Sequence, residues 1–134
     1  RGQTYDFGVI DNEAGMEHLS RRTTRDVNAL FVVTDPTVRG VVAAGRIAEL
    51  RHELDINIER AVLVVNRVQG ELSPALAAAV ADVQLPLGGL IPSDPMVTER
   101  DAEGKPLFDL PDTSLIYQSV CAMARRTLEA AVSR

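Results

Sequence analysis

Four short apolar runs, each followed by a segment of helical character, set the possible fold of this chain. The runs span residues 5–10, 29–34, 61–65 and 85–91. Their valine, isoleucine and leucine residues are nearly continuous, which is typical of strands covered on both faces. Strands that alternate with helices predict a doubly wound α/β fold with a mostly parallel sheet and helices on both faces. The last run is the weakest, because Gly88 and Gly89 lower its strand propensity.

Composition is compatible with one compact domain of this kind. The chain has 134 residues, 46% of them hydrophobic, so a single core can be buried. A formal net charge of -5 argues against a nucleic-acid binder, which normally carries a basic excess. The single cysteine, Cys121, excludes an internal disulfide framework and a cysteine-only metal site. We expect a reduced, cytoplasmic protein with neither a transmembrane helix nor a signal peptide.

The segments between the runs predict helices. A charged candidate spans about 17–26, and a longer one extends from Thr37 to Leu54. Its expected buried stripe is Ala43, Ile47, Leu50 and Leu54. Ser73 followed by Pro74 is a typical helix start, and the buried face expected after it is Leu76, Val80 and Val83.

The last third of the chain predicts an irregular segment and a closing helix. Residues 101–112 contain Gly104 and Pro106 and predict a loop or a small hairpin. Residues 112–114 are expected to cap the closing helix. The expected inner stripe of that helix is Ile116, Val120, Ala124, Leu128 and Ala131.

Polar residues follow each apolar run where its strand is expected to end. They are Asp11, then Thr34, Asp35, Pro36 and Thr37, then Asn66 and Arg67, and finally Pro92, Ser93 and Asp94. Parallel strands bring their carboxyl ends to one edge of the sheet, where open α/β sheets bind ligands. We therefore expect all four groups along a common edge.

The chemistry of these groups suits a nucleotide. A carboxylate such as Asp11 can hold a divalent cation beside a phosphate, and Gly15 would let backbone N–H groups approach that phosphate. Asn66 offers the paired donor and acceptor needed to read a purine edge. Each residue also has a purely structural interpretation: Asp11 as a helix cap, Asn66 as a turn former and Asp94 as an N-cap.

Residues 5–22 resemble one particular protein family. The most specific part of this segment is the string Glu13-Ala14-Gly15-Met16-Glu17-His18. The segment resembles the switch II region of CooC-type ATPases, the nickel-insertion accessory proteins of carbon monoxide dehydrogenase. These belong to the MinD/ParA/nitrogenase-iron-protein group of P-loop NTPases. The similarity continues through residues 35–40, 64–67 and 90–94, and therefore covers nearly the whole chain. The string itself is similar to CooC rather than to MinD.

The resemblance implies a role for each of these residues. Asp11 would order magnesium-bound water, and Gly15 would sense the γ-phosphate of ATP through its backbone amide. Asn66 would recognise adenine with Arg67 beside it. The residues that would line the base and ribose are Pro92, Ser93 and Asp94. Those that would lie near a dimer face that changes with nucleotide state are Glu13, Glu17 and His18, although His18 also suits a surface or capping position.

Several family features have no counterpart in these residues. No Gly-x-x-x-x-Gly-Lys-Ser/Thr pattern occurs, and the family's switch I aspartate and Cys-x-Cys pair lie upstream of the matched region. Residues 1–134 thus resemble the C-terminal portion of a single nucleotide-binding domain, which we expect to be inactive alone. In the family the P-loop strand lies beside the strand that ends at Asp11. We therefore expect these residues to fold with a missing partner, to dimerise or swap, or to be the ordered part of a longer protein.

The resemblance implies an ATP- and magnesium-dependent ATPase that works as a homodimer. Its output would be metal-centre maturation, with carbon monoxide dehydrogenase as a client and nickel bound through upstream cysteines. Neither nucleic-acid binding nor stable membrane insertion is expected. Two alternatives stay open: a MinD/ParA-like positioning or recruitment ATPase, and a degenerate scaffold that has lost catalysis.

Overall fold

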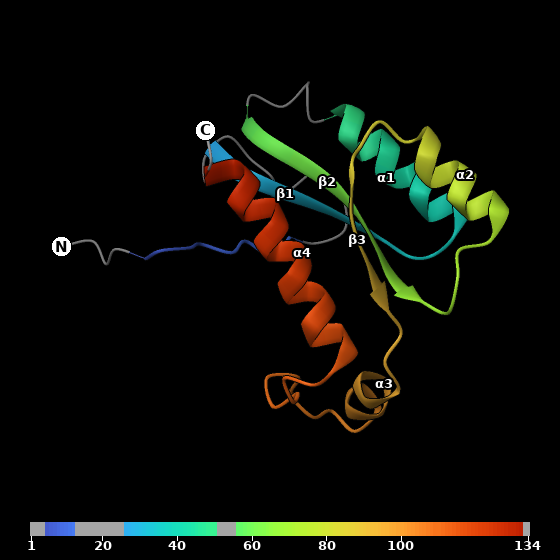
Figure 1. Cartoon of the computed structure of the whole chain (residues 1–134), viewed down its shortest axis with the longest axis vertical. Helices are drawn as coiled ribbons and strands as arrows, with labels where there is room; N and C mark the ends of the chain where they lie inside the picture. The colour runs from blue at the N-terminus through green and yellow to red at the C-terminus, as the bar shows by residue number, and fades with distance from the viewer. Residues whose placement is uncertain (1–4, 13–25, 51–55, 133–134) are drawn as a thin grey trace.

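The computed structural model describes residues 5–12, 26–50 and 56–132, and shows a three-stranded α/β unit (Figure 1). The strands are β1 (Asp26–Thr34), β2 (Asn57–Val68) and β3 (Leu87–Pro92). The helices are α1 (Val38–Leu50), α2 (Pro74–Asp82), α3 (Pro95–Ala102) and α4 (Leu115–Val132). None of the helices in these ranges is long and apolar enough to cross a membrane.

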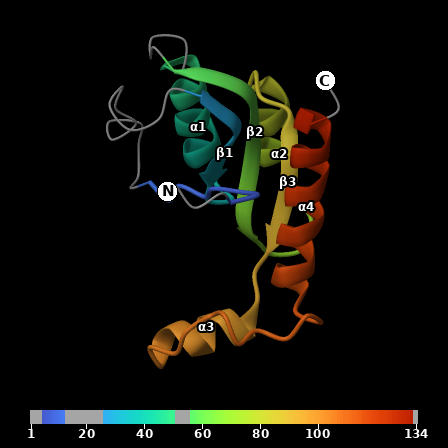
Figure 2. The ribbon, with the colours of Figure 1, turned by 90° about the vertical axis from the view of Figure 1, so that its left-hand side faces the viewer.

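The sheet is parallel and has the order β1-β2-β3. Helices α1 and α2 cover one face and α4 covers the other, while α3 projects beyond the sheet (Figure 2). The doubly wound α/β class predicted from the sequence is therefore confirmed.

The central strand β2 explains why its apolar run is continuous. Residues Ala61, Leu63 and Val65 pack into the core beneath α1 and α2. Between them, Val62 and Val64 join Met123 of α4 in a second cluster on the opposite face. All five are buried because helices cover both faces, so no position along this part of the strand is left for a polar side chain.

The predicted strand at 5–10 is not formed. Residues 5–12 have neither helix nor strand, and Tyr5 and Val9 are 73% and 94% exposed. An apolar run becomes a strand only where another strand supplies its hydrogen bonds, and among the described residues β1 pairs only with β2. The expected row of four strand ends is therefore a row of three.

The buried stripe predicted for α1 is wrong in its register. The buried residues are Val41, Ala44 and Ala48, whereas Ala43 and Leu50 are exposed. Apolar residues occur on almost every side of this helix, so more than one set has helical spacing. Small residues face the sheet because they let α1 lie close to it. Ile47 is partly buried, and residues 51–55 lie outside the described ranges.

The stripe predicted for α4 is also displaced. Its buried residues are Met123 and Thr127, while Val120 is exposed and Ile116 only partly buried. Residues 124 and 128 are half-buried, and the side chain of residue 131 is not described. Neither Met123 nor Thr127, the two buried residues, belongs to the predicted stripe.

The expected start of α2 is confirmed. The Oγ of Ser73 accepts a hydrogen bond from the backbone N–H of Leu76 at 3.3 Å, with Pro74 at the first helical position. Leu76 is buried and Val80 and Val83 pack against the core, as predicted. Of the 101–112 segment, residues 101–102 end α3 and residues 103–112 form a loop and not a hairpin. The charged helix expected at 17–26 lies outside the described residues except for Asp26, which begins β1.

Candidate nucleotide-base site at the carboxyl edge of the sheet

Two of the predicted groups meet where β2 and β3 end. Val68 pairs with Pro92 in the ladder, and the backbone N–H of Ser93 donates to the carbonyl oxygen of Val68 at 2.8 Å. Asn66 and Arg67 precede Val68 directly, so the structure brings them beside Pro92 and Ser93. The side chains of Asn66, Pro92 and Ser93 are half-buried.

A bulge shapes the end of β2. The register with β3 shifts between Val65 and Val68, and the two residues in between are Asn66 and Arg67. Arg67 has a φ of 58°, the one positive φ outside glycine among the described residues. The Oδ1 of Asn66 accepts the backbone N–H of Arg67 at 2.9 Å and holds this conformation. Bulges and left-handed residues redirect side chains and are frequent beside binding sites.

Asp94 occupies the N-cap of α3. Its Oδ1 accepts a hydrogen bond from the backbone N–H of Met96 at 2.9 Å, and Pro95 stands at the first helical position. The structural interpretation of Asp94 as an N-cap is thus confirmed. The helix itself was missed from the sequence, although Asp94-Pro95 carries the same signal as Ser73-Pro74.

The end of β1 supplies a third tight turn at the same edge. Thr34 is buried at 9% exposure, and its Oγ1 donates to the carbonyl oxygen of Asp35 at 3.3 Å. The Oγ1 of Thr37 accepts the N–H of Gly40 at 3.0 Å, which fixes the start of α1. A β-carbon at Gly40 would lie 2.5 Å from the Oγ1 of Thr34, so only glycine fits.

The phosphate end of the predicted site is not assembled by the described residues. Asp11 lies in the exposed segment 5–12, which has no strand, so its expected position at the end of a strand is not seen and its role in the site stays a prediction. Glu13, Gly15, Glu17 and His18 lie outside the described residues. Within the described ranges no three His, Cys, Asp or Glu side chains could hold a metal together. Of the predicted site, the described residues bring together the groups at the ends of β2 and β3.

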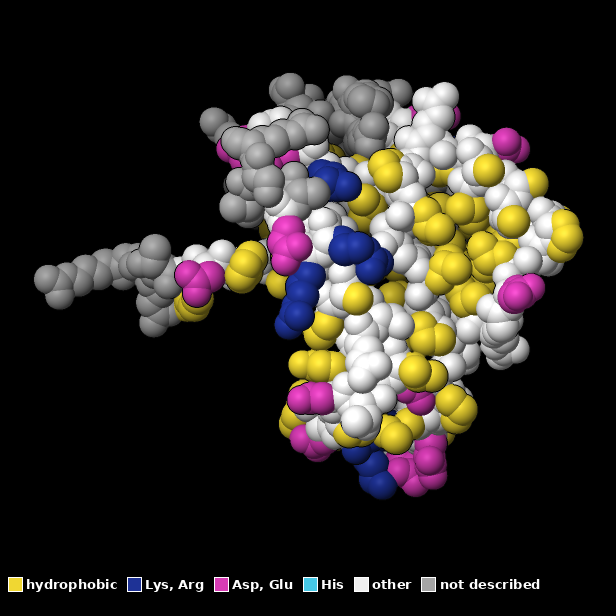
Figure 3. Space-filling model, viewed as in Figure 1, with side chains coloured by type: hydrophobic (Ala, Val, Ile, Leu, Met, Phe, Trp, Pro, Cys, Tyr) yellow, Lys and Arg dark blue, Asp and Glu magenta, His cyan; other side chains and the backbone are white. Residues whose placement is uncertain are grey.

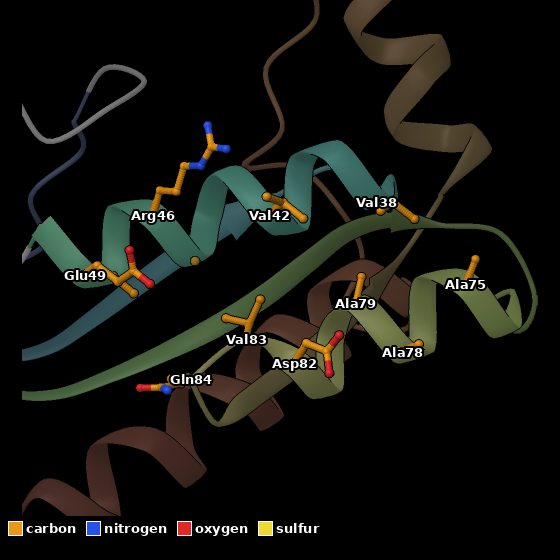
Figure 4. A pocket seen from close by; sticks show the side chains of 12 residues that line it. Val38, Val42, Arg46, Glu49, Ala75, Ala78, Ala79, Asp82, Val83 and Gln84 are labelled. Atoms are coloured by element: carbon orange, nitrogen blue, oxygen red, sulfur yellow. The ribbon is translucent and has the colours of Figure 1, made fainter.

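A groove between α1 and α2 is separate from these strand ends. Its volume is about 660 Å³, and its apolar lining includes Val42 of α1 and Ala79 of α2. Figure 3 shows hydrophobic side chains gathered over these two helices, and Figure 4 shows Val83 between them. A β-carbon on Gly45 would touch Val83 at 3.4 Å, which is where the helices approach. The groove runs along the helices, and its charged side chains, Arg46, Glu49 and Asp82, lie among apolar ones.

One ionisable group near the start of α4 is perturbed. The pKa of Tyr117 is raised above 10.0, chiefly by a hydrogen bond to the side chain of Cys121 and by the charge of that thiolate. Asp112 raises the pKa further, and the guanidinium of Arg125 opposes the shift. The phenol therefore stays protonated and neutral throughout the physiological range.

Comparison with known proteins identifies relatives over most of the chain. An uncharacterized ATP-binding protein of Methanocaldococcus jannaschii, MJ0685, is 37% identical over 124 residues, 92% of this chain and 49% of that protein. The carbon monoxide dehydrogenase accessory protein CooC of Rhodospirillum rubrum is 31% identical over 76% of this chain and 38% of its own. The septum site-determining protein MinD of Bacillus subtilis is 30% identical over 94% and 48%. No protein-family model matches the chain.

Solved structures show the same fold. MinD of Pyrococcus horikoshii, complexed with Mg-ADP, matches with a TM-score of 0.59 and 21% identity over 78% of this chain and 42% of its own. The MinC:MinD complex of Aquifex aeolicus matches with a TM-score of 0.57 and 20% identity over 76% and 43%.

The sheet, its helices and these matches define the class: a parallel α/β fold of the MinD type. Within that class the chain is similar in sequence to proteins described as ATP-binding proteins, as CooC and as MinD. It spans about half the length of the curated relatives it matches.

Proposed function

We propose that residues 1–134 form the C-terminal, base-binding portion of a nucleotide-binding domain in a CooC/MinD-like ATPase. The observation that carries this proposal is the bulge at Asn66 and Arg67 beside Pro92 and Ser93. Asn66 reads the edge of adenine, and Pro92 provides an apolar wall beside it. The preference for ATP over GTP is supported by the names of the relatives, among them ATP-binding proteins and a MinD solved with Mg-ADP.

The phosphate end of the site is assigned to residues near the start of the chain. Asp11 acts on magnesium through water, and the backbone N–H of Gly15 contacts the γ-phosphate. Glu13, Glu17 and His18 lie at the face through which two nucleotide-bound copies meet. The chain contains no Gly-x-x-x-x-Gly-Lys-Ser/Thr motif, so phosphoryl transfer requires groups that these residues do not provide.

Nucleotide titration of the full-length protein tests the base site. Asn66→Ala removes the carboxamide and is expected to weaken ADP binding about tenfold, the loss typical of one or two hydrogen bonds at a binding site. Asn57→Ala is the matched control, because Asn57 begins the same strand and its side-chain N–H donates to Oδ1 of Asp26 at the opposite end of the sheet, at 3.2 Å. Equal ADP affinity in the two variants and the wild type would overturn the assignment.

The output of the ATPase is proposed to be metal-centre maturation, with nickel as cargo and carbon monoxide dehydrogenase as a client. The support is the Glu-Ala-Gly-Met-Glu-His string and the similarity to CooC. A Cys-x-Cys pair in the sequence immediately upstream of Arg1 and nickel binding by the full-length protein would bear this out.

A MinD-like recruitment ATPase is the second candidate, favoured by MinD similarity over 94% of the chain. It predicts nucleotide-dependent partner binding without any affinity for nickel. If the full-length protein binds no nucleotide at millimolar concentration, a scaffold without catalysis is the remaining interpretation.

A further inference from the structure

The carboxylate of Asp94 joins two helices that are far apart in the sequence. Its Oδ1 accepts the N–H of Met96 in the first turn of α3, at 2.9 Å. Its Oδ2 accepts the hydroxyl hydrogen of Ser114, at 3.0 Å and twenty residues further along. Ser114 immediately precedes α4. One side chain therefore caps α3 and anchors the start of α4.

Ser114 is built into this junction through all of its polar groups. Its Oγ donates to Asp94 and also accepts the N–H of Tyr117, at 3.4 Å, which makes it the N-cap of α4. Its own N–H donates to the carbonyl oxygen of Pro111 at 2.8 Å. The residue is only 6% exposed, so water competes little for the hydroxyl. A hydrogen bond to a carboxylate in such a place is among the stronger ones in proteins.

The residues between Asp94 and Ser114 form a closed excursion from the sheet (Figure 2). The guanidinium of Arg100 donates to the carbonyl oxygens of Pro106, at 3.0 Å, and Asp109, at 3.4 Å, and so holds the loop against α3. The excursion leaves and rejoins the body at the hydrogen bond between Asp94 and Ser114. Asp94 directly follows Pro92 and Ser93 in the chain, so this bond joins the end of the proposed apolar wall to the start of α4.

We propose that Asp94 and Ser114 are positioning residues for the nucleotide base, an inference that rests on the proposed function. They tie Pro92 and Ser93 to α4, which packs on the sheet, and thereby hold the apolar wall at a constant distance from Asn66. Asp94 acts through its bonds to Met96 and Ser114 instead of contacting the base or ribose. Ser114, which the sequence analysis treated only as a cap, belongs to the support of the site.

The test compares two N-cap serines in the full-length protein. Ser114→Ala and Ser73→Ala each remove one hydroxyl that caps a helix, with bonds of 3.4 Å and 3.3 Å to the cap N–H groups. Both are expected to lower the thermal midpoint, Ser114→Ala by more, because its buried hydroxyl also bonds a carboxylate. Of these two serines, Ser114 also bonds Asp94, the residue that follows Pro92 and Ser93 of the proposed apolar wall. Ser114→Ala is therefore expected to weaken ADP binding about tenfold, while Ser73→Ala leaves it unchanged.

The preference for ADP over GDP distinguishes a positioning role of Ser114 from a purely structural one, because a purely structural role would leave this preference unchanged. The ratio of GDP to ADP dissociation constants is expected to fall toward one in Ser114→Ala and to stay at the wild-type value in Ser73→Ala. Ser114→Thr keeps the hydroxyl and is expected to restore both affinity and ratio. Adding Ser114→Ala to Asp94→Ala is expected to cause no further loss of ADP affinity, because the two residues act as one pair.

The results separate this inference from the function on which it rests. Wild-type protein that binds neither ADP nor GDP contradicts the proposed function. Wild-type protein that binds ADP, combined with equal affinity and equal base ratio in Ser114→Ala, overturns the positioning role alone. Equal losses of ADP affinity in Ser114→Ala and Ser73→Ala would also overturn it, since they would reflect general destabilisation.

Discussion

Adjacent glycines in β3 provide a sharp test of how the core is packed. A β-carbon on Gly88 would lie 2.7 Å from Cγ2 and 3.0 Å from Cβ of Val62. Ordinary carbon contacts are about 3.5–4.0 Å, so the overlap is most of an ångström. Val62 is 2% exposed and β-branched, and it packs with Val64, Ile91 and Met123, so it has little room to move. We expect Gly88→Ala to cost about 1–3 kcal/mol.

The neighbouring glycine is the matched control. The atoms nearest to a β-carbon on Gly89 would all belong to the side chain of Met123, at 3.2 Å for Cγ, 3.3 Å for Sδ and 3.4 Å for Cβ. A methionine can change rotamer, and alanine gains roughly 0.5–1 kcal/mol over glycine in a strand, so Gly89→Ala is expected to be nearly neutral.

Urea unfolding of the full-length protein, with both variants and the wild type, measures the difference directly. Combining Gly88→Ala with Val62→Ala should recover part of the loss, because the smaller side chain leaves space for the new methyl group. A stable Gly88→Ala together with a strongly destabilised Gly89→Ala would refute the packing described for this face of the sheet.

Two further predictions concern α1 and α4. Gly40→Ala is expected to destabilise the protein by about 1–3 kcal/mol in urea unfolding, since its β-carbon would lie 2.5 Å from Oγ1 of Thr34 and 2.9 Å from Oγ1 of Thr37. Gly45→Ala, with its contact to Val83 at 3.4 Å, should be neutral or stabilising; equal losses would contradict the tight turn. Cys121→Ala should lower the pKa of Tyr117 toward 10.0 in an ultraviolet titration referenced to Tyr117→Phe. An unchanged titration in Cys121→Ala would contradict the assigned cause. Because the pKa of Tyr117 is raised in the folded state, the contribution of Tyr117 to stability is complete below pH 10.0 and is lost as the pH rises through the raised pKa.

Local signals in the sequence predicted much of this fold. The run at 61–65 gave β2, because five consecutive apolar residues have one simple explanation, a strand buried on both faces. Ser73-Pro74 and Ser114 gave the starts of α2 and α4, because caps depend on residues that are adjacent in the chain.

The errors arose where a segment depends on distant partners. The run at 5–10 has the composition of a strand, but a strand needs a neighbour, and local composition does not say whether one is present. The stripe of α1 could not be chosen from its spacing, because Val41, Ala44 and Ala48 are selected by contact with the sheet and not by hydrophobicity. The glycines of β3 seemed unfavourable in isolation, and their fit against Val62 and Met123 becomes visible only across elements.

The sequence likewise predicted some features of the candidate site and not others. Asn66, Arg67, Pro92 and Ser93 were predicted to meet because parallel strands align their carboxyl ends, and β2 and β3 do so. The bulge at Arg67 and the bond between Asp94 and Ser114 were not predicted, since each depends on a register or a contact between separate segments.

The structure of the full-length protein with Mg-ADP bound tests the central claim most directly. The account predicts adenine within hydrogen-bond distance of the Asn66 side chain and packed against Pro92, with Asp94 still bonded to Ser114. Adenine bound at any other part of the molecule, or an Asn66 side chain directed away from it, would contradict the account.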